Sequence, residues 1–295
     1  MRIGIDLGGT KIELVVLDKK DSIIYTQRCD TPAGSYSRTV DAIAELVVAA
    51  EVELKTGSLT VGMCSPGIES PDSGLMKNCN STCLNGQPLR RDLSARLGRE
   101  VRMANDANCF ALSEAADGAA AGKSSVFAVI LGTGVGAGLV INGQIIPGTN
   151  GIAGEWGHNP MPLVNAKDKR SCYCGSENCV ETFLSGSGLV KTYIEKGGNK
   201  LPVEQLVTHA MAQQATAIEA LASYQRQLAA ALSVVINIVD PEVIVLGGGL
   251  SNIDRLYAAV PELWLETIFS DRVRTQLLRP LYGDSSGVRG AARLW

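Results

Sequence analysis

The stretch Leu131-Gly-Thr-Gly-Val-Gly-Ala-Gly138 joins two apolar runs, 126–131 and 137–141, through a turn rich in glycine. A similar order opens the chain, where Asp6-Leu-Gly-Gly-Thr-Lys11 lies between the apolar runs 3–7 and 14–17. Short apolar runs bounded by glycine turns are typical of buried strands. Because the pattern occurs twice, it predicts an α/β protein of two related lobes with a ligand cleft between them.

Both turns are suited to hold the phosphates of a nucleotide. Glycine lets the backbone approach an anion, its amide donates a hydrogen bond, and a threonine hydroxyl adds a donor. A third glycine run follows the apolar run 243–246. Asp6 could hold Mg²⁺ through water, because Mg²⁺ takes few protein ligands besides phosphates. The predicted nucleotide-binding residues are Asp6, Gly8, Gly9, Thr10, Lys11, Gly132, Thr133, Gly134, Gly136, Gly247, Gly248 and Gly249.

Two other matches to nucleotide-binding motifs are excluded by the elements that flank them. The segment Gly118-Ala-Ala-Ala-Gly122-Lys123-Ser124 is one residue short of a Walker A loop and follows a predicted helix instead of a strand. The segment 132–137 loosely matches the dinucleotide fingerprint, but a strand follows it where that motif requires a helix.

A cluster of metal-binding residue types lies near the middle of the chain. The spacing His-x13-Cys-x-Cys-x4-Cys offers four ligands, as in a closed, tetrahedral structural zinc site. The alternative is three free thiols and a histidine satisfied by its neighbours, which three cysteines within eight positions disfavour. Glu155 and Glu181 bracket the cluster, so a bound metal would also orient two carboxylates. The predicted zinc ligands are His158, Cys172, Cys174 and Cys179.

A candidate for acid–base chemistry follows the predicted strand 101–104. There Asn105-Asp106-Ala-Asn108 precedes a predicted helix. Asp and Asn favour helix N-caps, so a purely structural role is one interpretation. The other is that Asp106 faces the cleft and accepts a proton from a hydroxyl group. The sequence leaves both interpretations open.

Composition excludes several classes of protein. The 295 residues are 45% apolar and 19% charged, which is typical of a globular protein with one large domain or two lobes. The net charge of −3, without a basic block, argues against a nucleic-acid partner. The apolar runs are too short to span a membrane, and the N-terminus does not resemble a signal peptide. The five remaining cysteines are scattered, which indicates reduced thiols in a cytoplasmic protein.

Apolar periodicity and turn residues predict the other elements. Further strands are expected at 23–28, 59–64, 101–104 and 144–146. Helices are expected at 39–54, 89–97, 108–121, 188–196, 215–239 and 252–269, with a short last helix that reaches residue 295.

Together these motifs resemble the ROK family (repressors, open reading frames, sugar kinases) of the actin-like ATPase superfamily, over the whole chain. The most specific part is Glu155-x-x-His158 with Cys172-x-Cys174-Gly175-x-x-x-Cys179-x-Glu181. The family usually has glycine before the third cysteine, and here Asn178 stands there, which also tolerates a left-handed backbone. The resemblance implies two actin-like (ribonuclease H-like) lobes, 1–113 plus 285–295 and 114–284, with a zinc loop at 158–181.

The resemblance also implies an activity and roles for individual residues. It indicates an ATP-dependent hexose kinase with Mg²⁺ and structural Zn²⁺ that forms a homodimer. Asp106 would be the base for the sugar hydroxyl. His158 could ligate zinc through one ring nitrogen and meet the sugar through the other. The implied sugar-binding residues are Gly67, Asn80, Asn105, Glu155, His158 and Glu181.

Three stretches, 80–89, 154–160 and 283–290, are most similar to the bacterial fructokinase, or manno(fructo)kinase, branch. The expected acceptor is therefore the 6-hydroxyl of fructose, and the alternatives are N-acetylglucosamine, mannose or glucose. A ROK repressor is disfavoured, because the first strand begins at Ile3 and leaves no room for a preceding helix-turn-helix domain. An actin-like ATPase that binds no sugar would leave the signature from Glu155 to Glu181 without a purpose.

Overall fold

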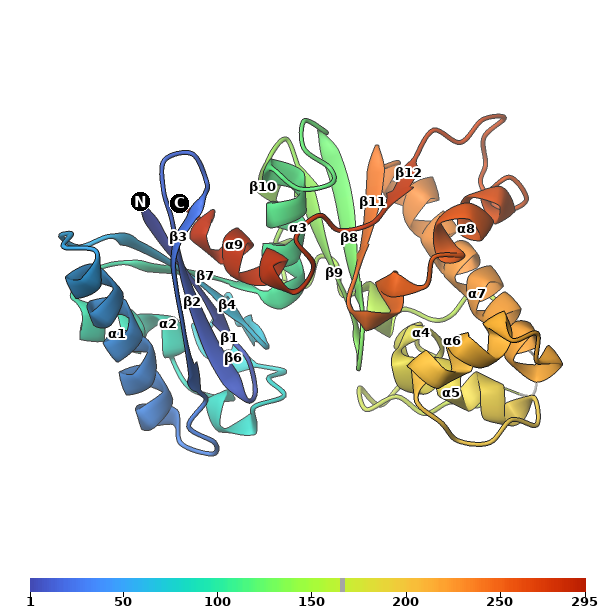
Figure 1. Cartoon of the computed structure of the whole chain (residues 1–295), viewed down its shortest axis with the longest axis horizontal. Coiled ribbons are helices and arrows are strands. Elements are labelled where there is room, and N and C mark those ends of the chain that lie inside the picture. The colour runs from blue at the N-terminus through green and yellow to red at the C-terminus, as the bar shows by residue number, and fades with distance from the viewer. Residues whose placement is uncertain (165–167) are drawn as a thin grey trace. The chain divides into compact units, whose positions relative to one another are not determined.

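The computed structural model describes residues 1–164 and 168–295 and has an α/β architecture (Figure 1). The described chain divides into two compact units. Residues 165–167, which lie between the predicted zinc ligands His158 and Cys172, are outside the described residues. Unit 1 consists of Met1–Ala121, Gly138–Ala153 and Leu281–Trp295, and unit 2 of Gly122–Ala137 and Gly154–Pro280. Residues 138–153 thus belong to unit 1, whereas the expected second lobe, 114–284, included them. The lobe boundaries stay a prediction.

Unit 1 is built on a five-stranded sheet with the order β3-β2-β1-β4-β7. The first strand pairs antiparallel with β2 and parallel with β4. Because side chains alternate along a strand, Ile3, Ile5 and Leu7 enter the main core, whereas Gly4 and Asp6 point to the other face. The strands are β1 (Arg2–Leu7), β2 (Lys11–Leu17), β3 (Ile23–Asp30), β4 (Thr60–Ser65) and β7 (Val101–Asn105).

Helices cover both faces of this sheet (Figure 1). The first two pack against the main core, and the last lies on the face to which Asp6 points. A two-stranded hairpin, β5 (Ile68–Glu69) and β6 (Met76–Lys77), precedes a short 3-10 turn, η1 (Thr82–Leu84). The helices of unit 1 are α1 (Tyr36–Glu53), α2 (Leu89–Leu97), α3 (Asp106–Ala116) and α9 (Ser286–Ala292), the last preceded by η4 (Gly283–Ser285).

The last helix, α9, packs against α3 at very short range. Gly290 lies directly against the carbonyl oxygen of Cys109, so any side chain at position 290 would overlap that backbone. Val288 and Ala292 form a small core with Val15 and Leu17 of β2. The C-terminal end of the chain therefore covers the face of the sheet that carries Asp6.

A buried carboxylate in α3 connects this helix to two distant segments. Glu114 is completely buried. Its Oε2 accepts hydrogen bonds from the backbone amides of Ala119, at 2.8 Å, and Leu281, at 3.0 Å. Its Oε1 accepts one from the hydroxyl of Ser286, at 2.6 Å. One side chain therefore joins the end of α3 to the start of α9.

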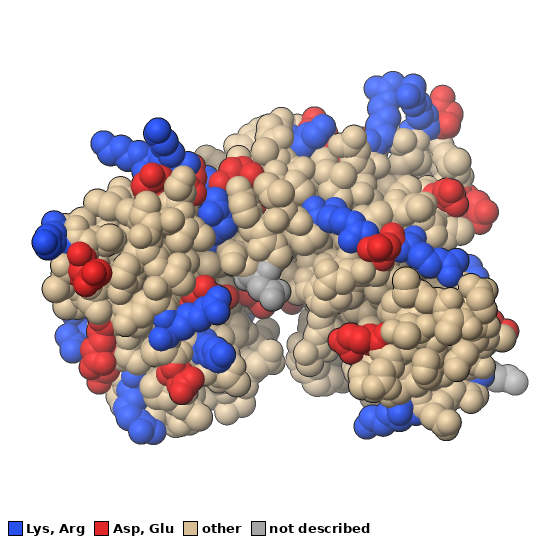
Figure 2. Space-filling model, in the orientation of Figure 1, with Lys and Arg blue, Asp and Glu red and all other residues tan. Residues whose placement is uncertain are grey.

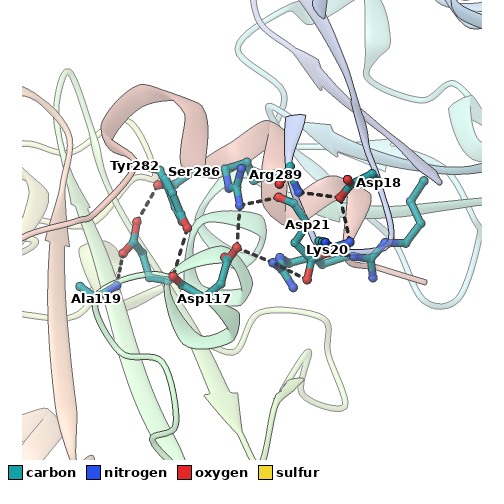
Figure 3. A network of polar contacts seen from close by, with 12 residues as sticks. Asp18, Lys20, Asp21, Asp117, Ala119, Tyr282, Ser286 and Arg289 are labelled. Carbon is teal, nitrogen blue, oxygen red and sulfur yellow. Dashed lines mark hydrogen bonds and ion pairs between the residues drawn. The ribbon is translucent and has the colours of Figure 1, made fainter. Parts of the chain in front are cut away.

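An ionic network links α9 and the residue after α3 to the β2–β3 turn (Figure 3). Arg289 donates to the carboxylate of Asp117 at 2.6 Å and to the carbonyl oxygen of Asp21 at 3.1 Å. Arg293 forms ion pairs with both aspartates, and Arg2 pairs with Asp21. Because the guanidinium groups of Arg289 and Arg293 are nearly buried, these pairs fix α9 in one position.

The second sheet has the order β10-β9-β8-β11-β12. Within it, β11 pairs in parallel with both β8 and β12. The strands are β8 (Ser125–Leu131), β9 (Val135–Ile141), β10 (Gln144–Ile145), β11 (Val243–Gly247) and β12 (Gln276–Leu278). The helices of unit 2 are α4 (Glu181–Leu184), α5 (Gly186–Glu195), α6 (Val203–Met211), α7 (Ala215–Val239) and α8 (Leu256–Trp264), with 3-10 turns η2 (Trp156–His158) and η3 (Gly249–Asn252).

The structure corrects two predicted helices and adds two. The helix expected at 108–121 ends at Ala116, because the Glu114 carboxylate accepts the amide proton of Ala119. The helix expected at 252–269 is shortened to α8, which begins only at Leu256, since the backbone is extended at Ile253. The α4 and α6 helices were not predicted. By contrast, α2 and α7 have the predicted bounds.

The described residues contain no helix that is long and apolar enough to cross a membrane. On the face drawn in Figure 2, Lys and Arg side chains are interspersed with Asp and Glu side chains. This distribution agrees with the small net charge of −3.

Candidate active site and metal centre

Four side chains in unit 2 form a compact set of metal donors. The ligand atoms of His158, Cys172, Cys174 and Cys179 all lie within 4.8 Å of one another. The sulfur atoms of Cys174 and Cys179 are 3.6 Å apart, and Cys172 Sγ is 3.6 Å from His158 Nδ1. Two sulfur ligands of tetrahedral zinc, each ~2.3 Å from the metal, lie about 3.8 Å apart. The donor set therefore fits the predicted structural zinc.

One of these thiols is especially suited to be a metal ligand. A backbone hydrogen bond from Ser176, together with the thiol of Cys172, lowers the pKa of Cys174 to about 6. A thiolate binds metal where a thiol does not. Cys174 is also exposed, so an ion can reach the cluster from solvent.

The turn between the cysteines has the backbone that the sequence predicts. Gly175 has a φ of 92° and Asn178 a φ of 56°, both in the left-handed region. The expectation that Asn178 can replace the usual glycine is thus confirmed. Its side chain adds two contacts, since Oδ1 accepts from the amide of Arg170 and Nδ2 donates to the carbonyl oxygen of Asp168, each at 2.9 Å.

Two residues that the sequence analysis missed support this loop. Arg170 is buried and donates to the carbonyl oxygen of Thr182, at 2.8 Å, and to Glu195, at 2.5 Å. Tyr173 places its hydroxyl 3.0 Å from His158 Nε2, the nitrogen expected to meet a sugar. The signals in the sequence are an arginine and a tyrosine next to the cysteines, since Arg170 precedes Cys172 by two residues and Tyr173 lies between Cys172 and Cys174.

The glycine turn between β8 and β9 and the glycine run at 247–249 both contribute to the wall of one cavity in unit 2. Its volume is about 620 Å³. Gly132 and Thr133 come from the β8–β9 turn, and Gly249 begins η3. The remaining lining residues are Gly186, Ser187, Val203, Glu204, Val207, Leu250, Asn252 and Ile253. Three of the predicted nucleotide-binding residues are therefore brought together, beside apolar side chains that no motif had indicated.

The other glycines of these motifs are not among the lining residues. Gly136 lies inside β9, and Gly247 ends β11. Gly248 has a φ of 76° and lies against the backbone of Leu131. Its role is therefore to let β11 approach the end of β8.

The first glycine turn lines a separate cavity of about 390 Å³ in unit 1. Gly9 and Thr10 are in its wall, as is Asn80, which the resemblance assigns to sugar binding. The turn is closed by a hydrogen bond from the Gly8 amide to the carbonyl oxygen of Lys11, at 3.0 Å. The structure thus brings a predicted phosphate loop and a predicted sugar-binding residue to one cavity.

Two carboxylates of unit 1 lie in an environment that favours their neutral forms. Burial raises the pKa of Asp6, a hydrogen bond from Cys64 opposes this, and the charge of Asp106 raises it further. Burial also raises the pKa of Asp106, against the effect of a backbone hydrogen bond from Ala107. Asp106 is the first residue of α3. A raised pKa is one of the properties of carboxylates that act as acids or bases.

The structure also gives the positions of three further residues that the resemblance assigns to sugar binding. Gly67 follows β4 and packs directly against the sulfur of Cys79. Glu155 begins the turn that carries His158, whose amide donates to the carbonyl oxygen of Glu155 at 3.2 Å. Glu181 begins α4 and lines a cavity of about 250 Å³ together with Thr133 and Tyr173.

Two α/β units, glycine turns between strands and a Cys3His loop define the class of protein to which the chain belongs. The family model described as "ROK family" matches residues 2–295. The chain therefore belongs to the ROK family, and the resemblance inferred from its motifs is confirmed.

Individual relatives extend over the whole chain. An N-acetyl-D-glucosamine kinase of Mannheimia succiniciproducens is 40% identical over 302 residues, covering 100% of this chain and 99% of the relative. A ROK hexokinase of Thermus thermophilus superimposes with a TM-score of 0.88 at 30% identity, covering 99% and 96% of the two chains. A ROK family glucokinase of Streptomyces griseus, solved with glucose and AMPPNP, has a TM-score of 0.78 at 26% identity, covering 99% and 98%.

Proposed function

We propose that this protein is an ATP-dependent sugar kinase and that N-acetylglucosamine is its preferred acceptor. The observation that carries the proposal is the cavity that joins Gly132 and Thr133 with Gly249, because backbone amides and apolar side chains there suit a nucleotide. Membership of the ROK family supports the sugar as the other substrate. The glycine turn at 8–11 is proposed to contact phosphate as well.

In the proposed reaction, Asp106 is the general base. Its carboxylate accepts the proton of the acceptor hydroxyl while that oxygen forms a bond to the γ-phosphorus of ATP. The bond from the γ-phosphorus to its bridging oxygen breaks, and the electron pair leaves with ADP. The raised pKa of Asp106 brings this base closer to neutral pH, where proton transfer is most effective.

The metal ions have different proposed roles. Mg²⁺ supplied with ATP would neutralise charge on the transferred phosphoryl group, and Asp6 is the residue proposed to hold it through water. The Cys3His cluster is proposed to hold structural Zn²⁺, because all four of its donors are protein atoms. The expected homodimer and the cytoplasmic location stay predictions.

The preferred sugar differs from the one first expected. Local similarity in three stretches favoured the 6-hydroxyl of fructose. The relative with 40% identity over the full chain is an N-acetyl-D-glucosamine kinase, so whole-chain similarity favours the alternative. We propose the 6-hydroxyl of N-acetylglucosamine as the acceptor. The proposed sugar contacts are Gly67, Asn80, Asn105, Glu155, His158 and Glu181.

A kinase assay coupled to ADP release tests the proposal. The purified protein would be assayed with ATP and Mg²⁺ against N-acetylglucosamine, fructose, mannose and glucose. The highest kcat/KM is expected with N-acetylglucosamine, and ³¹P NMR of the product should place the phosphate on carbon 6. A higher kcat/KM with fructose would restore the first expectation. If none of these sugars supports ADP release, the kinase proposal is overturned.

A further inference from the structure

The β8–β9 glycine turn is held by residues that follow the last metal ligand in sequence. The amide of Val135 donates a hydrogen bond to Oε2 of Glu181 at 2.8 Å. The amide of Gly186 donates to the carbonyl oxygen of Gly132 at 2.8 Å. Glu181 is two residues after Cys179 and begins α4, and Gly186 begins α5. The beginnings of these two helices therefore hold the two ends of the turn.

The turn also fits closely against this carboxylate. A Cβ atom at Gly134 would lie 2.7 Å from Oε2 of Glu181, which is closer than such atoms approach. On the other side, Gly157 lies directly against the carbonyl oxygen of Val135. Gly157 immediately precedes the ligand His158. Val135 is therefore held between two segments that each carry a metal ligand.

We propose that Glu181 is a positioning residue for nucleotide binding and acts through the amide of Val135. The carboxylate holds the turn in the conformation in which Gly132 and Thr133 line the cavity of about 620 Å³. The inference rests on the proposed function, because the ligand of this cavity is taken to be a nucleotide. It gives Glu181 a role in addition to the sugar contact that the family resemblance implies, because the amide of Val135 uses only Oε2 of the carboxylate.

The physical basis is the charge-assisted hydrogen bond between a carboxylate and a backbone amide. Such bonds are stronger than neutral ones, and removal of the acceptor leaves a half-buried amide without its partner. Without Glu181, the turn is free to adopt other conformations, and nucleotide binding must select the competent one from among them. A glutamine side chain still offers an oxygen acceptor to Val135.

The test measures ADP binding by calorimetry in the absence of sugar, with N-acetylglucosamine binding measured separately. Glu181→Ala should weaken ADP binding about ten- to hundredfold. Glu181→Gln should restore it to within roughly threefold of wild type, because the acceptor oxygen is retained. Glu177→Ala is the matched control, since this exposed glutamate lies in the same loop, and ADP binding should not change.

A second variant keeps Glu181 in place. Gly134→Ala introduces the Cβ atom that collides with Oε2, so it should also weaken ADP binding. Its effect should be smaller in the Glu181→Ala background, because the colliding group is then absent. This non-additivity separates positioning from a general loss of stability.

Normal ADP binding by Glu181→Ala, together with lost sugar binding, would overturn the inference and leave Glu181 with the sugar contact alone. Equal loss of ADP binding in the alanine and glutamine variants would also overturn it. If the wild-type protein binds no ADP, the proposed function fails first and the inference fails with it.

Discussion

The side-chain oxygen of Asn105 accepts a hydrogen bond from the backbone amide of Asn108 at 2.8 Å. This bond makes Asn105 the N-cap of α3. The carboxylate of Asp106, the next residue, accepts a hydrogen bond from the adjacent amide of Ala107, also at 2.8 Å. The two interpretations of the segment thus apply to neighbouring residues. Asn105 caps the helix, and the carboxylate of Asp106 does not need to do so.

Replacement of Asp106 by asparagine should lower turnover about 10²–10⁴-fold, because the amide cannot accept the proton of the sugar hydroxyl. Sugar binding should change little, since size and one acceptor are retained. Steady-state kinetics and calorimetric sugar binding on the same variant check this. Near-normal turnover would remove Asp106 from the mechanism.

The same variant should be more stable than the wild type at neutral pH. Burial raises the pKa of Asp106, so the native state holds this proton more tightly than the unfolded chain does. Stability from that proton is present below the unfolded-state pKa of roughly 3.9 and is lost as pH rises through the raised native pKa. Asparagine carries no charge to bury, so the difference in Tm should grow from acidic to neutral pH.

Thermal melts of both proteins between about pH 4 and about pH 8 measure this difference. Asp72→Asn is the control, because Asp72 is exposed. Identical Tm values for Asp106→Asn and the wild type at pH 7 would contradict the prediction.

The freshly purified protein should contain about one zinc ion per chain, and Cys174→Ser should contain much less. Structural zinc in small peptides contributes roughly 10–16 kcal/mol of apparent binding free energy, so its loss should loosen residues 158–181. Elemental analysis measures the metal, and limited proteolysis measures the loop. Cys83→Ser is the control, since Cys83 lies in unit 1 and outside the cluster. Active wild-type protein without zinc would exclude this role.

Filling the cavity of unit 2 should weaken nucleotide binding selectively. Val207 lines the cavity from α6, so Val207→Phe should raise the KM for ATP roughly tenfold or more and leave the KM for the sugar unchanged. Gln205→Phe adds the same side chain at an exposed position of α6 and should have little effect. An unchanged KM for ATP in Val207→Phe would place the nucleotide elsewhere.

Removal of the Glu114 carboxylate should destabilise the protein by about 2–4 kcal/mol. Glu114→Ala leaves the amides of Ala119 and Leu281 and the hydroxyl of Ser286 without their acceptor. Urea unfolding measures the change in the free energy of unfolding. Glu45→Ala, on the exposed side of α1, should lie within about 0.5 kcal/mol of wild type. An equally small effect of Glu114→Ala would show that the network contributes little.

Much of the fold and the metal cluster could be predicted because their signals are local. The 25-residue helix α7 has its predicted bounds, since its apolar periodicity is continuous and Pro241 follows it. The four proposed zinc donors could be found from their spacing, because a metal requires its ligands to come together. The short α6 helix is less visible in the sequence, and the sequence analysis therefore missed the apolar wall of the cavity proposed to bind the nucleotide.

Residue types and their spacing are enough to identify the glycine turns, the Cys3His set, and the carboxylates of Asp106 and Glu181. The groups that these carboxylates contact depend on the packed three-dimensional structure. It directs Glu181 to the amide of Val135, 46 residues earlier in the chain, and it buries Asp106 so that its pKa is raised. The physical reason is that hydrogen-bond partners and burial depend on packing between distant segments, whereas turns, helix periods and metal spacing depend on neighbours along the chain.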